Sequence, residues 1–367
     1  MSITILVPLD GSPLAEQALT LAVALASRGS SRLVLVRAAP EAAGAAFAEL
    51  FAQQAVAAHE QGHRATAEAE LAALAERLQH KPVSVKAHVA AGDPASAILS
   101  TAVEEAADLI VMTSHAHGRS LNWPCGRVAE AVLARALVPC LLVPTEGQQP
   151  WPTDRPSRVL VTVDGSETAE GLPERLAPLL TAFGAEVLLL RVLDPPHYLV
   201  RPHPSASGPA VAPTDVAAAR AALERVAEPL RGALGRAVAT HIAVSPYPGS
   251  TIAELAREHQ ADLIALGLRG DAGGARLPLG SVSLAVLALA SGPILLVPMP
   301  RADGVHGQAT GVVNVSLSRP ELDVVVRALD ELLAREHASP TLEIAGELLA
   351  HLRELSESEH VHGRTEH

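Results

Sequence analysis

The sequence has few lysines, few aromatic residues and only two cysteines. Lys and Arg total 28 against 40 Asp and Glu, which gives a formal net charge of -12, and the only lysines are Lys81 and Lys86. An acidic chain of this kind does not neutralise a phosphate backbone, and an aromatic content of 2% offers little surface for stacking on bases. We therefore predict that nucleic acid is not a partner.

The two cysteines, Cys125 and Cys140, lie in apolar stretches and lack CxxC spacing, so we expect buried thiols rather than a disulfide or a metal pair. Long apolar runs are also missing, since no stretch reaches the ~18 uninterrupted apolar residues of a membrane span. The start, MSITILVPLDGS, enters a strand-like segment without a basic region or a cleavage site. These features predict a globular, cytoplasmic protein without membrane attachment.

What the sequence does contain is an internal repeat. A chain of 367 residues is too long for one ordinary domain of ~100 to 200 residues, and a shift of 154 residues superposes its two halves. The matched pairs are Asp10 with Asp164, Asp108 with Asp262, Gly126 with Gly280, and Val143 with Val297. Four anchors at one offset indicate a duplicated domain of ~145 residues.

Within each copy, short runs of Val, Ile and Leu alternate with longer stretches rich in Ala, Leu, Glu and Arg. This alternation is typical of a parallel sheet buried by helices on both faces. Each copy is therefore predicted to be a doubly wound α/β domain with five strands. The expected strands are 3–9, 32–37, 83–89, 109–113 and 140–143 in the first copy, and 158–163, 186–193, 237–244, 263–267 and 294–297 in the second.

The predicted organisation has four parts. Repeat 1 covers residues 1–146 and repeat 2 covers residues 157–300, with a linker rich in proline and polar residues at 147–156. Residues 301–367 form a small C-terminal helical extension. Two amphipathic stripes of apolar residues, separated by Ser339-Pro340, predict a helical hairpin in this extension, with a disordered end.

The most informative segment of repeat 2 is ADLIALGLRGDAGGARLPLGSVSLAVL. Its strand ends at Gly267, Gly270 follows, and after a loop Gly280 and Ser281 open a helix, which gives the spacing Gly-x2-Gly-x9-Gly-Ser. Glycines allow backbone amides to approach anionic oxygens, and the start of a helix presents unpaired N–H groups and a positive dipole end. The pattern therefore predicts a phosphate-binding loop rather than a ligand-free glycine turn.

This loop, together with the Val163-Asp164-Gly165-Ser166 turn after the first strand, resembles the universal stress protein family. The resemblance covers both repeats and implies a tandem member with a Rossmann-like fold of the adenine-nucleotide alpha-hydrolase type. It also implies that ATP, with or without Mg²⁺, is the ligand of repeat 2. The residues implied to face the ribose, adenine edge and phosphates are Asp164, Val192, Leu266, Gly267, Arg269, Gly270, Gly280, Ser281 and Val282.

Repeat 1 departs from this pattern. The same offset places Thr113, Ala116 and Gly126-Arg127 where repeat 2 has Gly267, Gly270 and Gly280-Ser281. Because a Cβ at either altered position is expected to crowd a phosphate, we predict that repeat 1 binds ATP poorly or not at all. Family members tolerate threonine at the first of these positions, which leaves the loss of ATP binding in repeat 1 open. Arg127 is expected to pair with an acidic neighbour or to hold a smaller anion.

Two further features have a functional and a structural interpretation. His115 with His117 and His59 with His63 have the short spacings of metal ligands, but neither pair has a third ligand at a recognisable spacing, so we expect no metal site. The proline-rich stretch 194–213 follows the second strand of repeat 2 and is either a flap over the base or a solvated loop.

The sequence favours an ATP-binding stress-response or signalling module over two alternatives. It contains no Walker motif, GxSxG elbow or other catalytic constellation, so we expect at most slow ATP hydrolysis. One alternative is a nucleotide-independent dimeric scaffold whose tail hairpin docks a partner. The other is an adenylating enzyme, which the DGSP and DGSE turns disfavour because such enzymes carry an SGGxDS-like loop.

Single-domain members of the family commonly pair through their last strands. The resemblance therefore implies that strands 140–143 and 294–297 can pair within one chain as an intramolecular pseudo-dimer, which would cover two sheet edges. A homodimer, or an unknown protein partner bound through the tail, is left open by the sequence.

Overall fold

The computed structural model describes residues 2–29, 31–39, 53–114, 125–144, 151–166, 171–194, 213–268 and 279–299. The chain divides into two units, Met1–His306 and Gly307–His367. The predicted hairpin of the C-terminal extension belongs to the second unit and lies outside the described residues.

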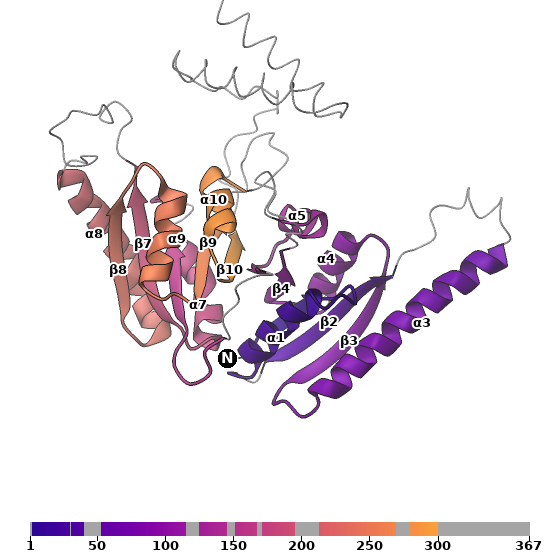
Figure 1. The fold of residues 1–367 in the computed structure, drawn as a ribbon. Helices are drawn as coiled ribbons and strands as arrows, with labels where there is room; N and C mark the ends of the chain where they lie inside the picture. Colours follow the sequence, from indigo (N-terminus) through magenta and orange to yellow (C-terminus); the bar gives the residue numbers. More distant parts are fainter. Residues whose placement is uncertain are drawn as a thin grey trace, which may run out of the picture. The chain divides into compact units, whose positions relative to one another are not determined.

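Each repeat contributes five strands to one sheet (Figure 1). The elements of repeat 1 are β1 (Thr4–Pro8), α1 (Ala15–Ala26), β2 (Arg32–Ala39), α3 (Gln53–Leu78), β3 (Ser84–Ala91), α4 (Pro94–Glu104), β4 (Leu109–Thr113), α5 (Arg127–Leu133) and β5 (Cys140–Val143). Those of repeat 2 are β6 (Arg158–Thr162), α7 (Leu172–Ala182), β7 (Glu186–Leu193), α8 (Pro213–Leu234), β8 (Val238–Val244), α9 (Pro248–Glu258), β9 (Leu263–Leu268), α10 (Ser281–Leu289) and β10 (Ile294–Pro298).

The ten strands follow the order β3-β2-β1-β4-β5-β10-β9-β6-β7-β8. All neighbouring strands pair in parallel except β5 and β10, which are antiparallel. Within each repeat the chain winds outward from its first strand in both directions, so the strand order reverses between β1 and β4 and between β6 and β9. The predicted fold class, two doubly wound five-stranded parallel domains in tandem, is confirmed for this part of the chain.

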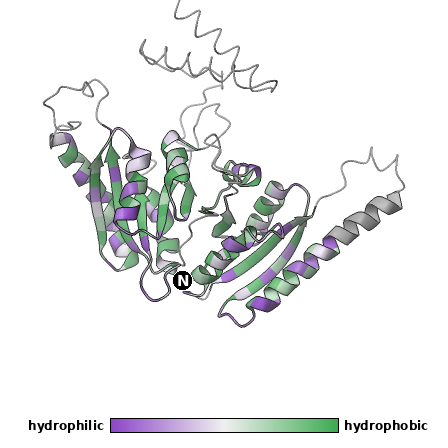
Figure 2. Ribbon diagram, in the orientation of Figure 1, coloured by the Kyte–Doolittle hydropathy of each residue, from purple (hydrophilic) through white to green (hydrophobic). Residues whose placement is uncertain are grey.

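Both faces of the sheet are buried, which explains why the strands are runs of apolar residues rather than alternating ones. Side chains such as Ile5 and Val7 join the core under α1, α3, α7 and α8, whereas Leu6, between them, joins the core under α4, α5, α9 and α10. Figure 2 shows hydrophobic residues along the strands and polar residues distributed over the helices. None of the helices in the described part is long and apolar enough to cross a membrane.

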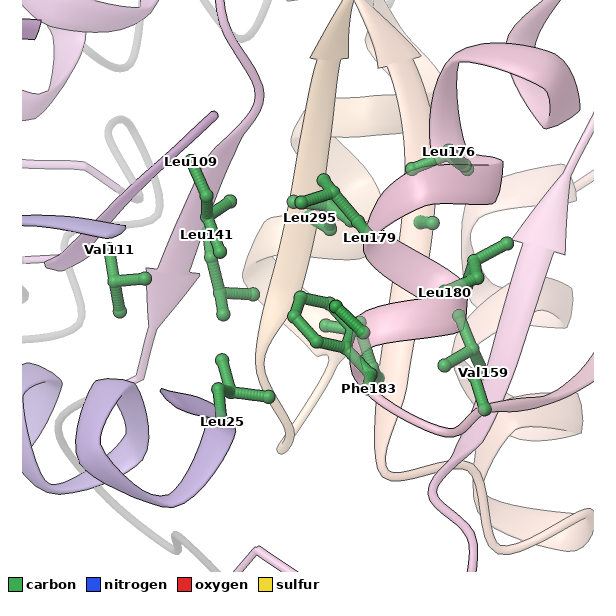
Figure 3. Close-up of a cluster of buried hydrophobic side chains, with 14 of the residues drawn as sticks. Leu25, Leu109, Val111, Leu141, Val159, Leu176, Leu179, Leu180, Phe183 and Leu295 are labelled. Atoms are coloured by element: carbon green, nitrogen blue, oxygen red, sulfur yellow. The ribbon is translucent and has the colours of Figure 1, made fainter. Parts of the chain in front are cut away.

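The two repeats meet where β5 and β10 pair. The register places Leu142 opposite Ile294, Leu141 opposite Leu295 and Cys140 opposite Leu296. On one face of this seam, Leu25 of repeat 1 and Phe183 of repeat 2 pack over Leu141 and Leu295 in a shared core (Figure 3). The expected intramolecular pairing of the last strands is therefore present, and it joins the two sheets into one.

An arginine and a tryptophan reinforce the seam. The Arg28 guanidinium of repeat 1 donates hydrogen bonds to the carbonyls of Phe183 in repeat 2 and of Pro152 and Arg155 in the connecting segment. The buried Trp151 ring meets the Phe183 ring edge-on, with centroids 6.2 Å apart. The segment that links the repeats is thus tied to both of them at its C-terminal end.

The repeated aspartate of the ADLI segments has a structural role in both halves. The Asp108 carboxylate accepts the Thr4 backbone N–H at 2.8 Å, and the Asp262 carboxylate accepts the Arg158 N–H at 2.8 Å. Asp262 also receives two hydrogen bonds of 2.8 Å from the Arg155 guanidinium. Each aspartate therefore holds the amino ends of two adjacent central strands together.

We predict that Asp262→Ala lowers the free energy of unfolding by about 1 to 3 kcal/mol, because it leaves the Arg158 N–H and the Arg155 guanidinium without their acceptor. Urea denaturation monitored by circular dichroism measures the change. The matched control is Asp154→Ala, which removes an exposed carboxylate of the same segment. Equal midpoints for the two variants would show that the Asp262 hydrogen bonds do not stabilise the sheet.

The two thiols provide a probe of the seam and of repeat 1. Burial raises the pKa of the Cys140 thiol to about 12, and burial, together with the nearby Glu130 carboxylate, raises the pKa of Cys125 to about 12. Both thiols are therefore protonated at pH 8 and shielded from reagents. We predict that neither reacts with a disulfide reagent at pH 8 until the protein is unfolded in denaturant. Rapid labelling of Cys140 in the native protein would show that the β5–β10 pairing opens readily.

Candidate functional site

Four of the sequence-predicted site residues lie at the carboxyl ends of the three central strands of repeat 2. Asp164 follows β6, Val192 lies near the end of β7, and Leu266 and Gly267 lie near the end of β9. Because β9, β6 and β7 are neighbours in the sheet, these ends meet at the point where the strand order reverses. Gly280, Ser281 and Val282 form the start of α10, and Arg269 and Gly270 lie outside the described residues.

Asp164 organises the turn that follows β6. Its carboxylate accepts the Ser166 backbone N–H at 2.9 Å and the Ser166 hydroxyl at 2.6 Å, and Gly165 between them has φ +80°. Asp10 and Gly11 form the same turn in repeat 1, with a hydrogen bond of 2.9 Å from the Ser12 N–H and φ +84°. The aspartate is therefore a turn residue in both repeats, whatever else it contacts.

The backbone N–H and C=O of Val192 face the space beyond the last residue of β6. Backbone groups of alternate residues in a strand point the same way, and the Leu190 carbonyl accepts the Val163 N–H at 3.0 Å on the β6 side. Leu193 points the other way, since its carbonyl accepts the Ser245 N–H at 3.0 Å after β8. The N–H and C=O of Val192 therefore face the β6 side, beyond the last paired residue, Thr162.

Gly267 lies close to a side chain just after β10 and to one in α7, which the sequence did not indicate. A Cβ at this position would lie 3.2 Å from Cγ of Met299 and 3.9 Å from Cδ2 of Leu172. These contacts are with side chains of the protein, and the expectation that a Cβ here crowds a phosphate stays a prediction. Thr113, at the same place in repeat 1, is accommodated and buried.

The start of α10 has no side-chain cap from the part of the chain that the structure describes. Gly280 is the N-cap in an extended conformation. Among the described residues, no side chain caps the helix and no atom lies within 4 Å of a Cβ built on Gly280. A helix start without a side-chain cap leaves N–H groups for solvent or a ligand, at the positive end of the helix dipole. This arrangement fits the predicted role of Gly280, Ser281 and Val282 beside an anion.

Repeat 1 has a formed cavity of about 310 Å³ at the corresponding edge. Asp10, Thr113 and Arg127 line it together with apolar side chains of β1, β2, β4, α4 and α5. Arg127 is exposed, and none of the described acidic residues forms an ion pair with it, so the expected acidic neighbour is not found in this part of the chain. The cavity shows that, in repeat 1, the residues matching Asp164, Gly267 and Gly280 face one space.

The other candidates are only partly covered by the structure. His115, His117 and most of the 194–213 segment lie outside the described residues, as do the side chains of His59 and His63. Where side chains are described, no three His, Cys, Asp or Glu residues are placed to hold a metal ion.

Arg191 is a residue of this edge that the sequence analysis missed. It lies on β7 beside Val192, and its guanidinium packs against Gly165, where a Cβ would lie only 2.3 Å from Cζ of the arginine. Its signal in the sequence is an arginine in an apolar strand, with an equivalent in Arg37, 154 residues earlier.

The comparisons with known proteins agree with this architecture. The universal stress protein family model matches residues 1–144 and 156–298. A universal stress protein from Archaeoglobus fulgidus DSM 4304 is similar in structure, with a TM-score of 0.57, 20% identity, and coverage of 81% of this chain and 96% of that chain. A putative universal stress protein from Pseudomonas aeruginosa UCBPP-PA14 has a TM-score of 0.55, 17% identity, and coverage of 81% and 93%.

No curated protein matches the chain. The structural similarities, at 20% identity or less, concern the fold. The family match itself extends over both halves of the sequence and coincides with the ten strands described above. The chain therefore belongs to the universal stress protein family.

Proposed function

We propose that the protein binds ATP at the carboxyl edge of repeat 2 and acts as a nucleotide-dependent stress-response or signalling module. The observation that carries this proposal is the position of the Val192 backbone. Its N–H and C=O face the space beyond the end of β6, next to the turn made by Asp164. A donor and an acceptor on the backbone of one residue match the hydrogen-bonding edge of a purine base.

The remaining site residues are proposed to contact the ribose and the phosphates of the ligand. In this proposal Asp164 faces the ribose, while Leu266, Gly267, Arg269 and Gly270 surround the ribose and phosphates. The start of α10, with Gly280, Ser281 and Val282, binds phosphate through backbone N–H groups and the Ser281 hydroxyl. ATP, with or without Mg²⁺, supplies the charged triphosphate, and the residues of this chain orient and bind it.

The site is proposed to bind rather than to transform its ligand. The sequence contains no Walker motif and no serine elbow, and the polar residues predicted at the edge are a turn aspartate and a helix-start serine. Hydrolysis, where it occurs, is expected to be slow. Binding energy is then available to shift a conformational equilibrium, as signalling requires.

We propose further that the β5–β10 pairing makes each chain an internal pseudo-dimer, with one nucleotide site in repeat 2. Assembly through β5 or β10 with another chain is then blocked, since both strands already have neighbours on each side. Contacts with a partner protein or a second copy are left to other surfaces, including the tail. The proposed location is the cytoplasm.

We predict that isothermal titration of the full chain with ATP gives one site per chain and that Gly270→Val weakens this affinity at least tenfold, which is about 1.4 kcal/mol or more of binding free energy. The physical reason is that a branched side chain at this loop position blocks the approach of phosphate oxygens to backbone amides.

The matched control is Ala116→Val, at the equivalent position of repeat 1, which is expected to leave the affinity unchanged. Unchanged affinity in Gly270→Val would remove the proposal. Absence of binding in the wild-type chain, together with protein that carries no nucleotide by mass spectrometry when freshly purified, would favour the nucleotide-independent scaffold.

A further inference from the structure

Repeat 1 keeps a formed cavity at its carboxyl edge, although its loop lacks two of the glycines of repeat 2. The cavity measures about 310 Å³, at the lower end of the ~300 to 1,000 Å³ that is usual for small-molecule pockets. Core side chains of β2, α4, β4 and α5 line it, and those of Val36, Ile98, Met112 and Ala129 are each 6% exposed or less. Such a lining suits a ligand with a compact apolar body.

The cavity also contains a backbone donor and acceptor, those of Ala38 near the end of β2. The Val36 carbonyl accepts the Leu9 N–H at 2.8 Å on the β1 side, and the Ala39 carbonyl accepts the Gly92 N–H at 3.1 Å on the β3 side. Because backbone groups of alternate residues in a strand point the same way, the N–H and C=O of Ala38 face the β1 side. Within the described part of the chain, neither group has a backbone partner there.

This combination favours a flat heteroaromatic ring. A ring with a donor and an acceptor on one edge can form hydrogen bonds with the Ala38 backbone while its faces contact the apolar lining. Asp10 lines the same cavity, and its carboxylate accepts the Ser12 N–H at 2.9 Å. Carboxylate oxygens accept several hydrogen bonds, including those of sugar hydroxyl groups. A purine nucleoside has both the ring and the hydroxyl groups.

The features that are proposed to bind phosphate in repeat 2 are changed in repeat 1. Thr113, a buried branched residue, stands where repeat 2 has Gly267, and Arg127 stands where it has Ser281. Arg127 is exposed, so water and salt screen its charge and its attraction to a phosphate group is weak. Ala129, in the lining, replaces a serine of repeat 2. The cavity therefore keeps the groups that suit a base and a sugar and has lost those that suit a polyphosphate.

We propose that repeat 1 is a second ligand site, which binds an unphosphorylated purine nucleoside through the Ala38 backbone and the apolar lining and does not bind ATP. The inference rests on the proposed function for the choice of a purine, since the backbone of Ala38 corresponds to that of Val192. It goes beyond that function in assigning repeat 1 a ligand of its own. One chain then carries two sites, one for the phosphorylated and one for the unphosphorylated form of related compounds.

The test titrates adenosine into the full chain saturated with ATP, which occupies repeat 2. Isothermal titration is expected to show one adenosine site per chain. Ala129→Leu fills the cavity, so it is expected to weaken adenosine binding at least tenfold and to change ATP affinity less than twofold. The matched control, Ala131→Leu, makes the same change on α5 at a residue outside the cavity lining, and it is expected to change neither affinity.

A second variant tests the backbone of β2. Ala38→Pro removes the N–H that faces the cavity but leaves Arg37 and Ala39 paired with β3. It is expected to weaken adenosine binding at least tenfold as well. Melting curves without ligand establish that each variant folds, and either variant serves the test if the other does not fold.

The outcomes separate this inference from the proposed function. No adenosine binding by the ATP-saturated chain would overturn the inference and leave the proposed function intact. Two ATP molecules per chain, one of them lost in Ala129→Leu, would also overturn it, because repeat 1 would then accept a polyphosphate. Adenosine binding that is unchanged in both variants would place the ligand elsewhere and overturn it too. Adenosine binding that Ala129→Leu weakens, in a chain that does not bind ATP, would support the inference and reject the proposed function.

Discussion

The antiparallel pairing of β5 with β10 is the contact on which the rest of the structure depends. It turns two five-stranded sheets into one sheet of ten strands and lets both hydrophobic cores run across the junction. The packing of Leu25 against Phe183 adds to this apolar contact between the repeats. The hydrogen bonds of Arg28 to repeat 2 and to the connecting segment make the contact specific. Because both repeats are fixed by this pairing, one of them can lose features of a ligand site and still contribute to the stability of the other.

The proposed site follows from the winding of the sheet rather than from any single residue. At the reversal of strand order, β6 ends before its neighbour β7, and the backbone of Val192 is left facing the gap. The turn made by Asp164 and Gly165 closes one side, and the open start of α10 supplies N–H groups on the other side of the edge. Such an edge is where ligands bind in open α/β sheets, because helix starts and strand ends meet there.

The fold could be predicted from the sequence in some detail, and the site only in outline. Repeated anchors such as Asp108 and Asp262 indicated the duplication, and their hydrogen bonds to the starts of β1 and β6 explain why they recur. Arg191 was missed because its contact with Gly165 joins β7 to the turn after β6, and contacts between elements are not visible in sequence spacing. The contact of Gly267 with Met299 could not be predicted, since it arises only when β9 and β10 are side by side.

The central claim is that nucleotide is held by repeat 2 and not by repeat 1. The most direct measurement is photo-crosslinking of the full chain with 8-azido-ATP, followed by identification of the labelled peptide by mass spectrometry. Our account predicts label on a peptide of repeat 2 from the carboxyl edge around β7 and β9, in competition with unlabelled ATP. Label confined to the cavity of repeat 1, around Asp10 and Arg127, or no label that ATP displaces, would contradict it.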